Sequence, residues 1–206
     1  MSRFTLAFGR ATLADRFFGR GLGIDLVLIA AGAALTAICA QVTIPVGPIP
    51  ITGQTIAVLF VGMFLGSLRG ALSMVVYALA GLAGMPIFSD GGSGAERLFG
   101  PSGGYIFGYI AAAALVGWIA QRGLDRTFLR SAASTLGGTA LVYLVALPWI
   151  AVWNGLSLQE TLAIGFFPFL LGAVVKSALV SAANTACWTS VARTDRHESR
   201  IDSTSF

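Results

Sequence analysis

The sequence predicts an all-α membrane protein with six transmembrane helices and both termini in the cytoplasm. Of its 206 residues, 56% are hydrophobic and only 11% are charged, whereas soluble domains usually carry about 25% charged residues. The mean hydropathy is +0.82, and several apolar segments approach the length of about 20 residues that crosses a bilayer core. The net charge of +4 lies at the ends of these segments. This placement is typical of a topology signal and not of a nucleic-acid-binding element.

The chain divides into three parts. Residues 1–23 contain four arginines and no long apolar run, so they are predicted to form a cytoplasmic arm and not a cleaved signal. Residues 24–192 hold the apolar segments and are predicted to form the six-helix membrane domain. Residues 193–206 are polar, and we expect them to be a disordered cytoplasmic tail.

The first span is expected over residues 24–44, because Pro45 ends a helix of suitable length. Residues 45–53 contain three prolines and two glycines, a composition that does not form a helix. An apolar segment without helical structure must be shielded by protein or must line a cavity at membrane depth. We therefore predict a lid or re-entrant loop.

The second and third spans are expected over residues 55–68 and 71–85, with Arg69-Gly70 as the turn between them. Both are short, which predicts thin, tilted or partly submerged spans. Residues 87–104 form a glycine-rich loop. The loop lacks the Gly-Lys-Ser/Thr ending of a phosphate-binding loop and contains two acidic residues, so a phosphate site is not expected there.

The fourth span is expected over residues 104–120. It opens with Gly104-x-x-x-Gly108, a spacing that lets two helices approach closely. A basic loop follows, and the fifth span is expected over residues 133–153.

The connector 154–165 is predicted to form a short surface helix. Ser157 would be its N-cap, with Glu160 at the third helical position. Pro168 suits the first turn of the sixth span, which is expected to end near Ala192.

The basic residues decide the orientation. With six spans both termini lie on one side, and a cytoplasmic N-terminus places 11 of the 13 basic residues in cytoplasmic segments, as the positive-inside rule requires. Arg97 falls on the outer side and Lys176 lies within the sixth span. The cytoplasmic set is Arg3, Arg10, Arg16, Arg20, Arg69, Arg122, Arg126, Arg130, Arg193, Arg196 and Arg200.

Lys176 is the only lysine, and it lies in an otherwise apolar segment without a carboxylate one or two helical turns away. A charge at the bilayer centre costs about 2.5–3.5 kcal/mol on insertion scales. Snorkelling to an interface, an acidic partner on another helix and an anionic ligand would each offset that cost. Eight residues after Pro168, Lys176 would lie ~12 Å below the outer surface, beneath three outer loops. The lysine therefore fits either a snorkelling side chain or a contact to an anionic small molecule in a pocket that faces outward.

Polar side chains gather where the proline-rich loop meets the second span. Thr52, Gln54 and Thr55 stand there, and one of them is expected to cap the helix. The Gln54 amide has both donors and acceptors, which would suit an amide-like or ureido group.

Two rows of side chains are expected to serve helix contacts. Ser177, Ser181 and Asn184 share one face of the sixth span, which favours interhelical hydrogen bonds. On the first span a row of alanines at small-xxx-small spacing fits either internal packing or the docking of another subunit. This row is Ala30, Ala33, Ala34 and Ala37.

Catalysis and cofactor binding are not predicted. The one histidine, His197, lies in the tail, and Cys39 and Cys187 stand alone in apolar segments. The sequence contains no HExxH, GxSxG or Walker A motif. Asp25 lies at a helix end and is interpreted as a topological charge.

Five sequence blocks, in this order, resemble the BioY family, the biotin-binding S components of energy-coupling-factor (ECF) transporters. They are Pro48-Ile-Pro-Ile-Thr-Gly-Gln-Thr55, Leu65-Gly-x-x-Arg-Gly-Ala71, Gly81-Leu-Ala-Gly-Met-Pro-Ile-Phe88, Gly100-Pro-Ser-Gly-Gly-Tyr105 and Gly172-x-x-x-Lys176. The resemblance spans residues 24 to about 190.

The resemblance implies a biotin pocket near the outer surface of a bacterial cytoplasmic membrane. It also implies a transmembrane coupling subunit and a cytoplasmic ATPase pair as partners, with the four alanines as the docking face. Lys176 would be a ligand contact, plausibly to the biotin carboxylate. The other expected ligand contacts are Tyr105, Gln54, Thr52, Gly104 and Ala173.

The chain departs from the resemblance at one position. Some members have an aspartate three residues before the lysine, and here that position is Ala173. How a ureido ring would be held is therefore open. An S component for another small vitamin and a structural membrane subunit without a ligand are the alternatives.

Overall fold

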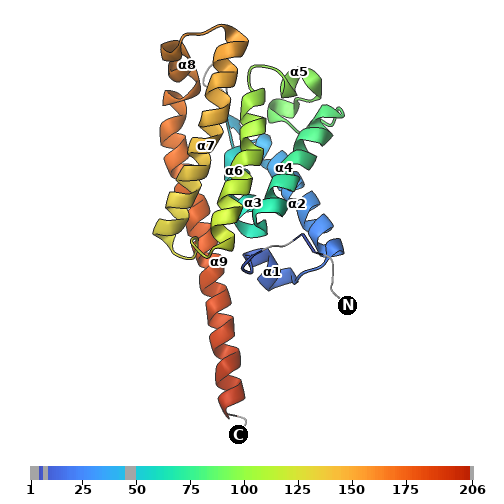
Figure 1. Ribbon diagram of the computed structural model, residues 1–206, viewed down its shortest axis with the longest axis vertical. Coiled ribbons are helices and arrows are strands. Elements are labelled where there is room, and N and C mark those ends of the chain that lie inside the picture. The colour runs from blue at the N-terminus through green and yellow to red at the C-terminus, as the bar shows by residue number, and fades with distance from the viewer. Residues whose placement is uncertain (1–4, 7–8, 45–49, 205–206) are drawn as a thin grey trace.

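The computed structural model describes residues 5–6, 9–44 and 50–204 of the chain. Helices dominate this part, and the longer ones run side by side as a bundle (Figure 1). Four described segments are long and apolar enough to cross a membrane: 22–40, 103–121, 128–154 and 158–194. The helices of 12 or more residues are α2 (Leu22–Ala40), α3 (Gln54–Leu65), α4 (Ser67–Leu82), α6 (Gly103–Gln121), α7 (Phe128–Asn154) and α9 (Leu170–Thr204).

Short elements cover both ends of the bundle. The end with the termini carries α1 (Leu13–Phe18), and the opposite end carries α5 (Gly94–Leu98) and α8 (Leu158–Gly165). The predicted N-cap of α8 is confirmed, because Ser157 and Glu160 form a reciprocal capping box. The remaining elements are the hairpin strands β1 (Thr43–Ile44) and β2 (Ile51–Thr52) and the 3₁₀ turns η1 (Ser89–Gly91) and η2 (Phe167–Phe169).

The proline-rich segment lies between the hairpin strands. β1 and β2 pair antiparallel, with Thr43 opposite Thr52. The predicted lid falls partly on residues 45–49, which lie outside the described residues.

The first span ends earlier than predicted, because α2 stops at Ala40 and residues 43–44 already belong to strand β1, before Pro45.

Three further helix ends differ from the sequence prediction. α3 and α4 meet at Gly66, whose φ of +90° ends α3, so Arg69 lies inside α4 and not in a turn. The N-cap of α3 is Gly53, and no side chain caps this helix. α9 continues to Thr204, so the segment from residue 193 is helical and not disordered. No glycine or proline follows Gly172 to interrupt it.

Helix α6 lies close to its neighbours because glycines face them. A Cβ on Gly104 would lie 2.5 Å from the Trp149 Cβ of α7, and one on Gly108 would lie 3.0 Å from the Val142 carbonyl oxygen. The close approach predicted from the Gly104-x-x-x-Gly108 spacing is confirmed.

A further close approach, at Gly117, yields a stability prediction. A Cβ on Gly117 would lie 2.3 Å from the carbonyl carbon of Gly66, whereas a Cβ on Gly137 of α7 would meet open space. In Gly117→Ala the backbone of α6 would have to move away from the backbone at Gly66. We therefore expect this change to lower the free energy of unfolding by about 1–3 kcal/mol. The matched Gly137→Ala change should be neutral or raise it by up to ~1 kcal/mol.

Thermal unfolding of the two alanine variants in detergent measures this difference. Equal transition temperatures for both variants would contradict the packing of α6 against the α3–α4 junction.

The N-terminal arm is fixed to the bundle by buried charges, which we call the Arg69 cluster: Thr12, Asp15, Asp25 and Arg69. The Arg69 guanidinium, 1% exposed, donates to Asp15 at 2.9 Å, to Thr12 at 3.0 Å and to Asp25 at 3.1 Å. Its Nε donates to the Leu65 carbonyl at 2.8 Å. Asp25 is fully buried, so its interpretation as a topological charge is incomplete.

The prediction that the polar face of α9 bonds to its neighbours is confirmed in part, because the buried Ser177 hydroxyl has no partner among the described residues. The Ser181 hydroxyl lies 3.3 Å from that of Thr135 on α7. The Asn184 side chain donates to the Asp125 carbonyl at 2.7 Å. These bonds hold α9 against α7 and against the α6–α7 loop.

Candidate functional site

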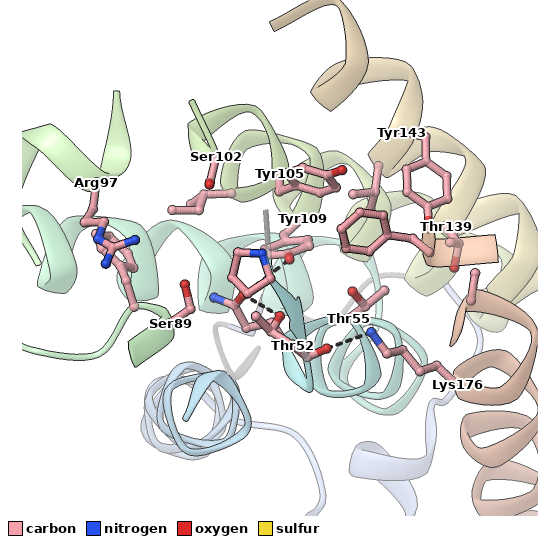
Figure 2. A pocket seen from close by; sticks show the side chains of 17 residues that line it. Thr52, Thr55, Ser89, Arg97, Ser102, Tyr105, Tyr109, Thr139, Tyr143 and Lys176 are labelled. Carbon is pink, nitrogen blue, oxygen red and sulfur yellow. Dashed lines mark hydrogen bonds between the residues drawn. The ribbon is translucent and has the colours of Figure 1, made fainter. Parts of the chain in front are cut away.

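A pocket opens within the bundle, and its empty space, including the open solvent at its mouth, is about 750 Å³. Its lining comes from the hairpin, the α4–α6 connection and four long helices (Figure 2). The lining residues are Pro50, Thr52, Gln54, Thr55, Phe88, Ser89, Arg97, Ser102, Tyr105, Ile106, Tyr109, Thr139, Val142, Tyr143, Phe169, Ala173 and Lys176.

Lys176 lies on α9 and joins this helix to the hairpin. Its Nζ donates to the Thr52 carbonyl at 2.7 Å, which Figure 2 marks with a dashed line. Within the described ranges, no carboxylate lies at ion-pair distance from it. The ammonium group therefore has a neutral partner, and two of its three N–H donors remain for other acceptors.

Gln54 lies at the start of α3 and is 5% exposed. Its Nε2 donates to the Tyr77 hydroxyl at 2.6 Å, and its Oε1 accepts from Thr52 Oγ1 at 2.8 Å and from the Tyr109 hydroxyl at 3.4 Å. The amide is thus held in a fixed orientation by protein groups. It has one N–H left for a ligand.

Tyrosines form a wall of the pocket. The Tyr105 hydroxyl donates to the Gly165 carbonyl at 2.8 Å, which orients its ring across the ring of Tyr143 at a centroid distance of 6.5 Å and an interplanar angle of 84°. Tyr109 lies one helical turn further along α6 and is buried. Because the Tyr105 hydroxyl already has its acceptor, this residue offers a ligand mainly its ring.

The structure brings together five of the six residues predicted to contact a ligand. Lys176, Thr52, Gln54, Tyr105 and Ala173 all line the pocket. The sixth, Gly104, packs against Trp149 instead. Its role is to let α6 approach α7, because a side chain at this position would displace that helix.

Sequence reasoning missed Arg97 and two of the tyrosines. Arg97 is on α5, a segment predicted only as a glycine-rich loop. Its position as the one basic residue expected on the outer side was the signal that could have found it. Tyr109 follows Tyr105 at the i+4 spacing of one helix face. Tyr143 gave no comparable signal, because only the packing of α7 against α6 places it here.

The charges of the lining are all positive. Arg97 and Lys176 are its charged residues, and they lie on opposite sides of Tyr105 and Tyr109 in Figure 2. A pocket with two cations, no carboxylate, hydroxyl groups and aromatic rings suits a small anion with an apolar middle and polar ends. In the part of the chain that the structure describes, no three His, Cys, Asp or Glu side chains gather as metal ligands do.

The four alanines of the first span separate into two pairs. Ala33 is 7% exposed and belongs to a core cluster with Tyr77, and Ala37 is half-buried against the same cluster. Ala30 and Ala34 are exposed on the outside of α2. Internal packing therefore explains one pair, and the other pair is available to another chain.

Known proteins resemble this chain in sequence and in structure. The chain is 29% identical to the biotin transporter BioY2 of Lactococcus lactis, over 84% of this chain and 94% of that protein. It is 34% identical to the biotin transporter BioY of Thermotoga maritima, over 72% of this chain and 88% of that one. A crystal structure of the S-component for biotin from an ECF-type ABC transporter matches with a TM-score of 0.73 at 25% identity, over 79% of this chain and 89% of that one.

The profile of the BioY family matches residues 15–193. This range contains the hairpin, the long helices up to the end of their apolar part, and every residue of the pocket. The fold and the sequence therefore agree that this multi-pass membrane chain belongs to the BioY family.

Proposed function

We propose that this chain is the biotin-binding S component of an ECF-type vitamin transporter. The observation that carries the proposal is the pocket with Arg97 and Lys176 and no carboxylate in its lining. Biotin has a ureido ring at one end, an apolar middle and a carboxylate at the other end. The function is transport and not catalysis, in line with the relatives named as biotin transporters.

Lys176 is the better placed partner for the carboxylate. It is half-buried, and its Nζ has only a neutral carbonyl as partner among the described residues, whereas Arg97 is exposed. An ion pair gains more where water is excluded. The ureido ring would then lie toward the polar groups on the side of the pocket away from Lys176, where Ser89 and Ser102 line it (Figure 2).

Calorimetric titration of the detergent-purified chain with biotin and with biotin methyl ester tests the proposal. We expect tight binding of biotin and weaker binding of the ester, because the ester has no charge to pair with Lys176. Tight binding of both ligands would support the substrate and overturn the carboxylate assignment. If neither ligand binds, the proposal fails, and the alternatives are an S component for another small vitamin or a structural subunit without a ligand.

We propose that the chain crosses the bacterial inner membrane six times, with both termini in the cytoplasm. The pocket would then face outward. The pocket draws on η1, α5 and η2, which lie toward the end of the bundle away from the termini. α3 and α4 have 12 and 16 residues, or roughly 18 and 24 Å at 1.5 Å per residue. They would cross as short spans that meet at Gly66.

The proposed partners are an ECF transmembrane coupling subunit and a cytoplasmic ATPase pair, which would supply the energy for uptake. Ala30 and Ala34 are the exposed pair of the alanine row, and small side chains let a second helix approach closely. We therefore assign the docking face to this pair, while Ala33 and Ala37 serve the core.

Adding side chains to this face should separate binding from transport. We expect Ala30→Leu with Ala34→Leu to leave biotin affinity unchanged but to reduce complex assembly and uptake at least tenfold. Ala133→Leu with Ala140→Leu is the matched control, because those alanines are exposed on α7. Normal co-purification of the coupling subunit with the α2 variant would rule this face out.

A further inference from the structure

Two arginines from distant parts of the sequence converge over a glycine at the end of α6. A Cβ on Gly123 would lie 3.2 Å from Nη1 of Arg10 and 3.7 Å from Nε of Arg126. Arg10 is held there by two bonds of the arm. Its side chain donates to the Arg122 carbonyl at 3.2 Å, and its backbone N–H donates to the Gln121 carbonyl at 3.2 Å.

Tryptophans hold two guanidinium groups at this end of the bundle. Arg122 lies over the ring of Trp118 at 3.5 Å from Cζ to centroid, and Arg126 lies over Trp188 at 4.5 Å. Stacking on an aromatic face occupies the flat side of a guanidinium and leaves its N–H edges free. The donors at the edges can therefore take a phosphate oxygen each without a rearrangement.

Arg10, Arg122 and Arg126 form no ion pair within the part of the chain that the structure describes. The nearby acid is Asp125, which is fully buried and accepts from the Trp188 ring N–H at 3.0 Å and from Asn184 at 3.3 Å. Burial raises the pKa of this carboxyl, and the nearby charge of Arg126 acts in the opposite direction.

Exposed apolar side chains lie in the same α6–α7 segment of the chain as Arg122 and Arg126. Leu124 is 46% exposed, Phe128 is 48% exposed and Leu129 is 79% exposed, and all three lie on the α6–α7 connection or the first turn of α7. A soluble anion would not need such neighbours. A phospholipid would, because its phosphate meets the cations while its acyl chains cover the apolar side chains.

We propose that Arg10, Arg122 and Arg126 form a binding site for the headgroup of an anionic phospholipid. The lipid belongs to the leaflet at the end of the bundle that carries α1 and the α6–α7 loop (Figure 1). Its phosphate neutralises the converging guanidinium groups. The bound lipid also links the N-terminal arm to the end of α6, because Arg10 belongs to the arm and contributes to the site.

The test uses the purified full-length chain after removal of lipid in detergent. Thermal unfolding is followed after adding phosphatidylglycerol, phosphatidylcholine or inorganic phosphate. We expect phosphatidylglycerol to raise the transition temperature by about 3 °C or more, equivalent to roughly 1 kcal/mol, and the other two additions to have little effect. Arg10→Gln with Arg126→Gln should lose most of this shift.

The matched control is Arg130→Gln with Arg193→Gln. It removes the same charge from two exposed arginines that do not converge on Gly123. An equal loss in both double variants would mean general attraction by net charge and would overturn the site. An equal shift with inorganic phosphate would overturn the lipid assignment.

Biotin titration of each variant is an independent check of folding. Loss of the lipid shift with intact biotin binding would support the site. If the wild-type chain binds no biotin but responds to phosphatidylglycerol, the proposed function fails while the lipid site stands. A single Arg126→Gln variant, which leaves the arm bonds of Arg10 in place, should show at least half of the loss. An unchanged shift in this variant would remove Arg126 from the site.

Discussion

Replacing Arg69 with methionine is expected to lower the free energy of unfolding by about 3–5 kcal/mol, because removing one member of a buried ion pair leaves charge buried without a partner. Two carboxylates, Asp15 and Asp25, would lose their cation. Methionine keeps most of the apolar stem of the side chain. The loss would therefore come mainly from the guanidinium and its hydrogen bonds.

Thermal unfolding in detergent, followed by circular dichroism, measures this effect. Arg20→Gln is the matched control, because Arg20 pairs with the same Asp15 at 3.1 Å but is 38% exposed in its side chain. An exposed pair contributes only ~0–1 kcal/mol. If the two variants lose the same stability, the buried position of Arg69 does not determine the strength of the cluster.

A second comparison separates charge from packing. Asp25→Asn combined with Arg69→Met removes both partners of one buried pair. We expect the double variant to lose less free energy of unfolding than the two single variants lose in sum. Additive losses would show that the two side chains stabilise the fold independently.

Replacing Lys176 with alanine is expected to weaken biotin binding at least tenfold, which is ~1.4 kcal/mol, while the protein still inserts and folds. The lysine has two effects in the pocket. It supplies a positive charge, and it holds the hairpin through the Thr52 carbonyl. The two effects predict different results for charged and neutral ligands.

Calorimetry with biotin and its methyl ester on both proteins distinguishes these effects. If the charge acts on the ligand carboxylate, Lys176→Ala weakens the binding of biotin and leaves the binding of its methyl ester nearly unchanged. If the lysine only holds the hairpin, both ligands weaken equally, and the assignment of the carboxylate is wrong. Arg97→Gln is the matched control for the second cation, and we expect a smaller effect because Arg97 is exposed.

The sequence predicted the helices well where apolar length and glycine spacing determine them. The Gly104-x-x-x-Gly108 contact and the capping box at Ser157 depend on neighbours within one or two turns. The junction at Gly66 was placed three residues too late, because Arg69 was interpreted as an exposed turn residue. Only the tertiary contacts with Asp15 and Asp25 allow this arginine to be buried in a helix.

The candidate site was likewise predicted only where local sequence patterns point to it. Lys176 stood out because a charge in an apolar segment needs a partner, and Thr52 and Gln54 stood out as polar residues beside a non-helical loop. Arg97 could not be placed, because its position depends on how a glycine-rich loop folds over the bundle. The second Gln54 bond, to Tyr77 on α4, likewise joins elements that no local pattern connects.

The Arg69 cluster also sets a limit on how short the chain can be made. Thr12 and Asp15 belong to the arm, and the backbone N–H of Leu6 donates to Asp25 at 2.7 Å. A truncation at residue 24, where hydropathy alone would place the start of the domain, removes these partners from a guanidinium that is 1% exposed. We therefore expect a stable truncated chain to begin before Thr12, with affinity tags and fusion partners placed upstream of the arm.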